Sequence, residues 1–194
     1  KTFLKSMMAI AIPIALQNLI ISSLNMVDTL MISSLGQTSI AAVGLANQLF
    51  FFYIIITFGI NSGSSIFIAQ YWGKEDISSI RKVLGLALSI SAIVGIIFTI
   101  VAFFFPGFIM SLFIDEPEVI RIGSDYLRIV SLSYISTAIS FAYSVALRTT
   151  GRPNVSTKIS AISFVTNTVF NYILIFGKFG IPPMGVKGAA WGTV

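Results

Sequence analysis

The sequence predicts an all-α, polytopic membrane protein, and three observations indicate it. The 194 residues are 56% hydrophobic and only 10% charged, whereas soluble domains carry about 25% charged residues. Long apolar runs recur along the chain, each close to the ~20 residues that a helix needs to cross a bilayer. These runs lack the alternation of a strand, and they are too long for barrel strands of ~10 residues. Lipid is therefore the expected solvent for most of the chain.

Five apolar runs and the start of a sixth define the expected helices. They lie at about residues 7–35, 40–70, 83–105, 119–147, 156–177 and 185–194, the last cut off at Val194. The first run is far longer than the ~7–15 apolar residues of a signal peptide, so we expect it to be a lasting span. No linker or internal repeat divides the chain. Residues 1–194 are therefore interpreted as one transmembrane domain.

Glycine and proline residues mark the expected helix ends. Ser34-Leu35-Gly36 follows the first span, Gly151-Arg152-Pro153-Asn154 separates the fourth and fifth, and Pro182-Pro183 precedes the sixth. Inside the second span, Gly59 and Gly63 are four residues apart. This spacing favours a close contact with another helix over a binding site.

The basic residues predict the orientation. Eight of the twelve precede the first span or lie between spans two and three or four and five: Lys1, Lys5, Lys74, Arg81, Lys82, Arg148, Arg152 and Lys158. An alternate loop holds Asp115, Glu116 and Glu118. The positive-inside rule then predicts a cytoplasmic N-terminus. We expect a multi-pass protein of the plasma (cell inner) membrane. We also expect Arg128 to pair with Asp125, one turn away on the fourth span.

The composition excludes several classes of function. The chain has no cysteine and no histidine, which excludes disulfides, Cys/His metal sites, thiol nucleophiles and a Ser-His-Asp triad. Its net charge of +5 is scattered between apolar runs, so no nucleic-acid partner is expected. With a single intramembrane carboxylate, hydrolytic chemistry lacks its parts. We therefore expect no enzyme and no cofactor.

Asp28 is the only carboxylate deep inside an apolar run, because the other six acidic residues lie in loops or, like Asp125, near the boundary of a span. An ionised Asp in the hydrocarbon costs about 2.5–3.5 kcal/mol on insertion scales. Asp28 lies eight residues before Gly36, roughly 12 Å along a helix, which argues against a side chain that merely snorkels at the helix end. Such a residue should face a cavity, bind a cation or carry a proton. Intramembrane acids are functional by default, so function is favoured over a structural role.

A polar stripe on the fifth span supplies partners for Asp28. Its members are spaced three or four residues apart: Ser156, Ser160, Ser163, Asn167 and Asn171. Helical rise places Asn171 and Asn167 roughly 9 and 15 Å below Gly177, and Thr193 roughly 12 Å along the sixth span. We therefore predict a cation-binding and coupling site at Asp28, Asn167, Asn171 and Thr193. Its oxygens suit a sodium ion or a carboxyl that gains and loses a proton.

Other polar residues in the spans are expected to hold helices together or to line a cavity. The three serines of the stripe are expected to hold helices together through hydrogen bonds. Gln17, Asn47 and Gln48 are candidates for lining a substrate cavity.

A series of short motifs covers nearly the whole chain. They are Pro13-x-x-x-Gln17, Met26-Val27-Asp28-Thr29, Leu35-Gly36, Ile40-Ala41-Ala42-Val43-Gly44, Ile68-Ala69-Gln70-Tyr71-Trp72-Gly73, Arg148-Thr149-Thr150-Gly151-Arg152-Pro153, Asn167-x-x-x-Asn171-Tyr172-Ile173-Leu174-Ile175-Phe176-Gly177 and Gly180-Ile181-Pro182-x-x-Gly185-Val186-x-Gly188-Ala189-Ala190. In this order and spacing the chain resembles the N-terminal half of a multidrug and toxic compound extrusion (MATE) family transporter.

The resemblance implies a fold and an activity. MATE proteins have two six-helix lobes around a V-shaped cavity, and they exchange cationic and aromatic drugs for sodium ions or protons. Their N-lobe cation site carries over to Asp28, Asn167, Asn171 and, less directly, Thr193. Some members have an acid where this chain has Asn171, which argues against a proton relay that needs two carboxylates here. The sequence would then be an N-lobe with a truncated sixth helix, and its expected partners are drugs, the lipid bilayer and the missing C-terminal lobe.

Two alternatives stay open. A flippase for lipid-linked or amphipathic substrates would favour basic residues within the cavity, but no Lys or Arg falls in the middle of a span. A non-transporting membrane assembly subunit would use Asp28 as a structural partner, but no intramembrane cation is available to pair with it.

Overall fold

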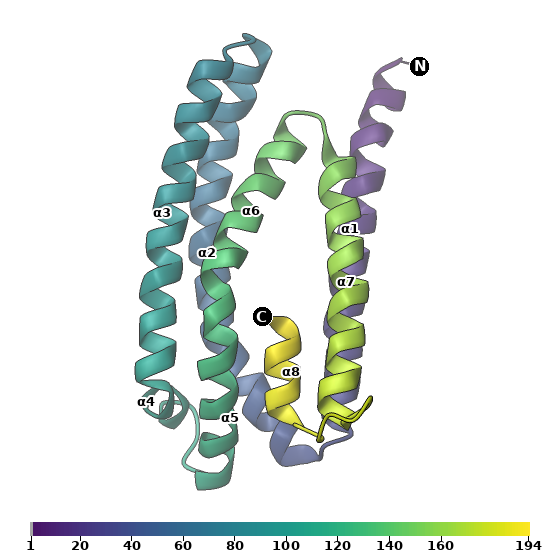
Figure 1. The fold of residues 1–194 in the computed structure, drawn as a ribbon. Coiled ribbons are helices and arrows are strands. Elements are labelled where there is room, and N and C mark those ends of the chain that lie inside the picture. The colour runs from purple at the N-terminus through teal and green to yellow at the C-terminus, as the bar shows by residue number, and fades with distance from the viewer. Residues whose placement is uncertain (1) are drawn as a thin grey trace.

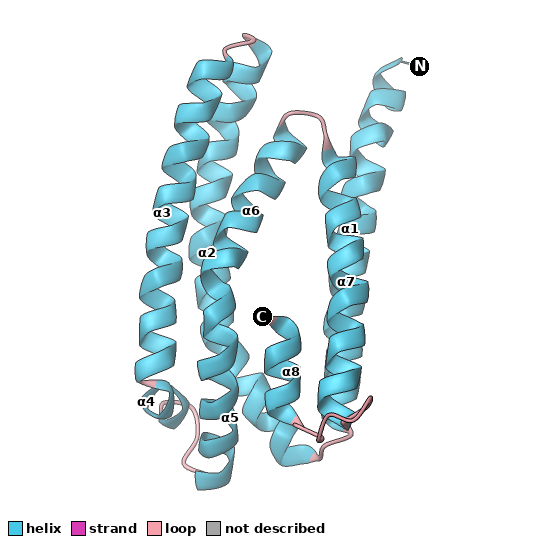
Figure 2. Cartoon of the chain, viewed as in Figure 1, coloured by secondary structure: helices cyan, strands magenta, loops and turns pink. Residues whose placement is uncertain are grey.

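The fold is helical throughout the part that the structure describes. The structure is a computed structural model that describes the backbone of residues 2–194 and the side chains of residues 7–9 and 11–194. The elements in order are α1 (Thr2–Ser33), α2 (Gln37–Gly73), α3 (Ile77–Phe104), α4 (Pro106–Ser111), α5 (Pro117–Val130), a 3-10 turn η1 (Ser131–Ser133), α6 (Tyr134–Thr149), α7 (Pro153–Phe176) and α8 (Val186–Thr193). Short loops join them (Figure 2). The predicted all-α class is confirmed.

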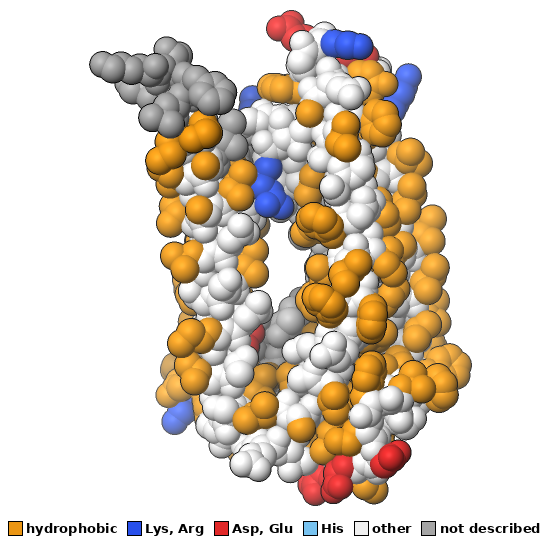
Figure 3. All heavy atoms as spheres, turned by 180° about the vertical axis from the view of Figure 1, so that it is seen from behind, with side chains coloured by type: hydrophobic (Ala, Val, Ile, Leu, Met, Phe, Trp, Pro, Cys, Tyr) orange, Lys and Arg blue, Asp and Glu red, His pale blue; other side chains and the backbone are white. Residues whose placement is uncertain are grey.

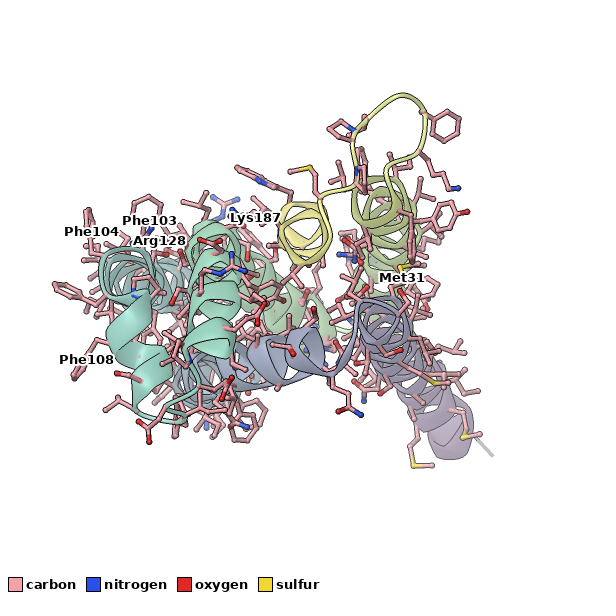
Figure 4. All side chains as sticks on the ribbon, turned by 90° about the horizontal axis from the view of Figure 1, so that it is seen from below. Met31, Phe103, Phe104, Phe108, Arg128 and Lys187 are labelled. Carbon is pink, nitrogen blue, oxygen red and sulfur yellow. The ribbon has the colours of Figure 1, made fainter. Side chains whose placement is uncertain are left out.

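Five stretches are long and apolar enough to cross a bilayer. They are Met7–Ser33, Gln37–Gly73, Ile77–Phe104, Pro117–Thr149 and Pro153–Phe176. Large apolar side chains cover much of the surface (Figure 3), and Phe103, Phe104 and Phe108 project outward from α3 and α4 (Figure 4). Such a surface is stable in lipid rather than in water, so the chain is a multi-pass membrane protein.

The helices form two groups. On one side α2 packs against α3, α5 and α6, and on the other side α1 packs along α7. Figure 1 shows α1 and α7 running in the same direction, with α8 rising between α5 and α7. The space-filling view from behind shows an opening between the two groups (Figure 3).

The fourth span is interrupted, although its apolar run predicted one continuous helix. The 3-10 turn η1 separates α5 from α6, and hydroxyl groups on neighbouring helices bind the carbonyls near it. Tyr53 Oη donates to the Tyr134 carbonyl over 2.6 Å, and Thr99 Oγ1 donates to the Ser131 carbonyl over 2.9 Å. Because backbone groups in lipid must find partners within the protein, these contacts from α2 and α3 stabilise the break.

The end of α7 returns the chain to α8. Gly177 follows α7 with φ 67°, a left-handed conformation that favours glycine. A Cβ atom at Gly177 would also lie 2.5 Å from the Pro183 nitrogen. The absence of a side chain therefore permits the tight return.

The predicted pair of Arg128 and Asp125 is wrong. Asp125 Oδ2 lies 3.1 Å from Nζ of Lys187 at the start of α8. Figure 4 shows Lys187 where α8 faces α5. Since α8 packs against α5, it brings an amine to Asp125 that spacing along the fourth span could not reveal. The short helix α4 was likewise not expected.

The close helix contact expected at Gly59 and Gly63 is absent from the described part of the chain. A Cβ atom at either position would meet no heavy atom within 4 Å. Gly188 and Gly192 of α8 are among the glycines that do lie close to another helix. Their built Cβ atoms collide with α7, at Leu174 and at Asn171 respectively.

Charges differ between the two ends of the molecule. The turn between α2 and α3, with Lys74, and the turn between α6 and α7, with Arg152, lie at the end that carries the N-terminus (Figure 1). Asp115, Glu116 and Glu118 lie before and at the start of α5, at the opposite end (Figure 1), and acidic side chains are visible at the bottom of Figure 3. Lys1 and the side chain of Lys5 lie outside the described residues. The orientation in the membrane stays a prediction.

Candidate functional site

Asp28 of α1 contacts Asn171 of α7. Asn171 Nδ2 donates to Asp28 Oδ1 over 2.7 Å. The Asn171 side chain is fully buried, and Asp28 is half-buried. Among the described residues, no Lys or Arg forms an ion pair with Asp28. The contact therefore leaves the carboxyl hydrogen-bonded but not neutralised by a cation of the protein.

Asn167 extends this contact to α8. Asn171 Nδ2 also donates to Asn167 Oδ1 over 2.9 Å, and Asn167 Nδ2 donates to the Gly192 carbonyl over 3.0 Å. Asn167 and Asn171 are one helical turn apart, so both side chains lie on the same face of α7. A continuous chain of hydrogen bonds thus joins α1, α7 and α8.

Gly192 permits this arrangement because it has no side chain. A Cβ atom at Gly192 would collide with the Asn171 side chain and lie 3.0 Å from the Asn171 backbone nitrogen. Gly188, one turn earlier, is as close to α7, since its Cβ atom would lie 2.6 Å from the Leu174 carbonyl carbon. The Gly188-x-x-x-Gly192 spacing is a known device for close helix contact in membranes. It therefore brings the Gly192 carbonyl within reach of Asn167.

The donor set of the site fits a hard monovalent cation or a proton. It contains one carboxylate, two amide oxygens and a backbone carbonyl, all of them oxygen ligands of the kind that hard cations prefer. Asn171 Oδ1 is buried and has no hydrogen-bond partner within the described part of the chain. A buried acceptor without a partner is costly in lipid, and a cation beside Asp28 would satisfy it after a rotation of the amide, because Oδ1 faces Gly192 while Nδ2 faces Asp28. No group of three or more His, Cys, Asp or Glu side chains that could hold a metal ion is present among the described residues.

The structure brings together three of the four residues predicted for this site. Asp28, Asn167 and Asn171 are joined by hydrogen bonds, but the exposed Thr193 is not part of the chain of contacts. Thr193 Oγ1 donates to the Ala189 carbonyl of its own helix over 2.9 Å. The contribution of α8 is instead the Gly192 carbonyl, which side-chain chemistry could not indicate. The glycine spacing of α8 was the one available signal.

The three candidates for a substrate cavity lie in different surroundings. Asn47 and Gln48 are exposed on α2. Gln17 is 4% exposed, and its amide nitrogen donates to Ser156 Oγ and Ser160 Oγ of α7. The structure thus places Gln17 in a helix interface rather than on an open wall. Ser156 and Ser160 hold helices together as predicted, whereas Ser163 is exposed.

The comparison with known families agrees with this arrangement of helices and polar residues. The family model described as MatE matches residues 13–173. The chain belongs to the MatE family. The predicted resemblance is therefore confirmed.

Individual relatives give the same result. The chain is 31% identical to the "Probable multidrug resistance protein YoeA" of Bacillus subtilis, over 98% of this chain and 41% of that protein. It is 29% identical to the "Probable multidrug resistance protein NorM" of Rhizobium meliloti, over 87% of this chain and 36% of that protein. A solved structure of a MOP superfamily transporter from Pyrococcus furiosus is 25% identical, with a TM-score of 0.87, over 97% of this chain and 41% of that one. The MatE chain therefore spans about two fifths of the relatives that it matches, which fits one lobe of a two-lobe transporter.

Proposed function

We propose that the MatE chain is the N-lobe of a secondary active multidrug efflux antiporter. The whole protein would export cationic or aromatic drugs across the plasma (cell inner) membrane in exchange for sodium ions or protons. The observation that carries the proposal is the intramembrane carboxyl of Asp28, hydrogen-bonded to Asn171 and connected through Asn167 to α8. The names of two relatives, both probable multidrug resistance proteins, support drug export.

The mechanism follows from the change of charge at Asp28. A sodium ion or a proton neutralises the carboxyl, and for sodium the oxygens of Asn171, Asn167 and Gly192 supply further ligands. Neutralisation changes which packing of α1, α7 and α8 is favoured, since all three helices share the hydrogen bonds. A drug that prefers the other packing is then released when the cation binds. Such linkage requires each ligand to bind the two states with different affinity.

The alternatives gain no support from the site. A flippase would need cations that hold phosphate groups, and an assembly subunit would need a cation that pairs with Asp28. Asp28 has no ion-pair partner in the described part of the chain. The relatives belong to a transporter family rather than to a family of enzymes, which supports a non-enzymatic role.

The proposal predicts that Asp28→Asn strongly reduces coupled export by the full-length protein. The substitution keeps the size of the side chain but removes the charge that binds the cation. A hydrogen bond to a charged group contributes about 1.5–3 kcal/mol, so drug efflux from proteoliposomes should fall about tenfold or more. Imposed sodium and pH gradients, tested separately, identify the coupling ion.

Asp115→Asn provides the control, since Asp115 is an exposed loop acid outside the site. It should transport at the normal rate. Near-normal efflux by Asp28→Asn, at equal expression, would remove the proposal.

A further inference from the structure

A second polar contact joins α1 to α7. Gln17 Nε2 donates to Ser156 Oγ over 2.8 Å and to Ser160 Oγ over 2.9 Å. Gln17 and Ser156 are buried, and Ser160 is half-buried. One amide of α1 thus lies between two hydroxyls that are one turn apart on α7. We call these three residues the Gln17 clasp.

The Gln17 clasp repeats the geometry of the Asp28 site at another level. Gln17 precedes Asp28 by 11 residues, and on α7 the pair Ser156 and Ser160 precedes the pair Asn167 and Asn171 by the same 11 residues. Eleven residues make about three helical turns, so each helix presents the same face at both levels, roughly 16 Å apart. Because α1 and α7 run in the same direction (Figure 1), a single register satisfies both contacts.

We propose that Gln17 is a positioning residue for the Asp28 site, and that its clasp with Ser156 and Ser160 sets the register of α1 on α7. This inference rests on the proposed function, because the site that it positions is the cation site. A slip by one turn moves Asp28 about 5.4 Å along α7. That displacement separates its carboxyl from Asn171, whose contact is only 2.7 Å long. The clasp therefore specifies where the cation ligands meet.

The Gln17 clasp carries a free-energy cost, which indicates that it specifies the register of the helices rather than adding stability. Gln17 Oε1 is buried and has no hydrogen-bond partner among the residues that the structure describes. A polar group that is only partly satisfied stabilises an interface less than an apolar side chain of similar size. Buried polar pairs are best attested as devices that fix register. The cost is therefore consistent with selection for alignment.

The clasp can be removed without separating the helices. Thr157 Oγ1 donates to the Pro13 carbonyl over 2.9 Å, and this contact does not involve Gln17. Gln17→Met keeps the volume of the side chain and fills the interface with apolar atoms. The variant should therefore fold, and its unfolding temperature should equal or exceed that of the wild type.

The first test measures cation dependence in the full-length protein. Gln17→Met should weaken the apparent affinity for the coupling cation about fivefold or more, the usual lower range of coupling between sites, while the maximal efflux rate falls less. Asn18→Met is the matched control, because Asn18 is the next residue of α1 and is exposed. It removes an amide at the same depth and should leave the affinity unchanged. An unchanged affinity in Gln17→Met would overturn the proposal.

The second test measures the register directly. Spin labels on cysteines introduced at Asn25 of α1 and Val169 of α7, both exposed positions, report their separation once any cysteine elsewhere in the full-length protein has been replaced. Gln17→Met should shift or broaden the distance distribution, and Ser156→Ala with Ser160→Ala should do the same. Combining all three substitutions should add little, since they remove one contact. An unchanged, narrow distribution in both variants would contradict a register-setting role.

The two proposals fail in different ways. If Asp28→Asn exports drugs normally, the proposed function fails whatever the spin labels show. If Asp28→Asn is inactive but Gln17→Met keeps wild-type cation dependence and distances, only the positioning role fails.

Discussion

At the scale of single residues, Asp28 is surrounded by amide groups rather than by basic side chains. Its described hydrogen bond comes from Asn171, which is itself tied to Asn167. An amide presents a donor and an acceptor on the same carbon, so a rotation of Asn171 would turn its unpartnered Oδ1 toward Asp28. Under the proposed function, Asn171 would therefore donate to the carboxylate when no cation is bound and would face a bound cation through Oδ1. A basic side chain paired with Asp28 would have no acceptor to present to a cation.

Asp76 allows a prediction about pH at the residue scale. It lies outside the spans and precedes α3, where its carboxylate accepts hydrogen bonds from Ser79 Oγ over 2.6 Å and from the Ser79 backbone nitrogen over 3.0 Å. These bonds, the hydroxyl bond first, hold the pKa of Asp76 below its ordinary range. A lowered pKa contributes stability that is present at neutral pH and is lost as pH falls through the folded-state value. Asp76→Asn should therefore flatten the fall of the unfolding temperature on the acid side.

Thermal unfolding of the full-length protein in detergent at a series of acidic pH values checks this. Asp115→Asn is a control, since Asp115 is an exposed acid outside this cap. If the unfolding temperature falls equally steeply toward acidic pH in wild type and Asp76→Asn, the hydrogen bonds between Ser79 and Asp76 do not contribute to stability.

Three of the four residues predicted for the candidate site could be placed from the sequence, and the fourth could not. The number of residues from each helix end predicted that Asp28, Asn167 and Asn171 lie at the same depth in the membrane, because helical rise is regular. The same count brought Thr193 to that level but could not tell which way its hydroxyl points. Since Thr hydroxyls in helices readily bond their own backbone, Thr193 donates to Ala189. The backbone carbonyl of Gly192 contributes instead, and residue identity alone carries no information about it.

At the scale of helices, the sequence predicted the spans better than their breaks. The apolar run of the fourth span continues through Ser131–Ser133, so nothing in its pattern marks the 3-10 turn. The turn is stabilised by Tyr53 and Thr99, which come from other helices. Tertiary contacts thus decide the break, and they are invisible in a local pattern. The two glycine pairs also depend on tertiary contacts. The pair at residues 59 and 63 and the pair at residues 188 and 192 have the same spacing, but only the second pair packs closely against another helix.

Gly188 supports a prediction about helix packing. In Gly188→Ala the new Cβ atom would lie 2.6 Å from the Leu174 carbonyl and 2.8 Å from the Ile175 nitrogen. Both are backbone atoms, so α8 must move away from α7. Overpacking of this kind costs about 1–3 kcal/mol, and the movement would also lengthen the contact between Asn167 and Gly192. We expect a lower unfolding temperature and weaker drug efflux in the full-length protein.

Gly59→Ala is the matched control for this helix contact. Gly59 also lies inside a helix, but its Cβ atom would meet open space. Alanine there should be neutral or stabilise α2 by up to about 1 kcal/mol, because it favours helix more than glycine. Equal unfolding temperatures for the two variants would argue against close packing of α8 on α7.

At the scale of the whole molecule, α8 connects the two helix groups, and the ion pair of Asp125 and Lys187 forms one of its two attachments. The ion pair holds the first turn of α8 to α5, while Gly188 and Gly192 hold α8 to α7. The helix that carries Gly192 of the candidate cation site is therefore attached to both groups. Under the proposed function, a change of packing at Asp28 would reach the α2, α3 and α5 side through α8.

The orientation of the whole molecule gives the last prediction. Lys74, Arg81 and Arg152 lie at or near turns at the end that carries the N-terminus, whereas the acidic string lies at the other end. The positive-inside rule then places the turn with Glu75 in the cytoplasm and the loop with Phe179 outside. The chain has no cysteine, so labels can be placed at single sites if the rest of the protein is also free of cysteine. In intact cells, a membrane-impermeant maleimide should label Phe179→Cys, whose native side chain is 89% exposed, and should label Glu75→Cys only after the membrane is opened. The reverse pattern would place the Asp28 site nearer the cytoplasm, so that the coupling cation would enter it from inside the cell.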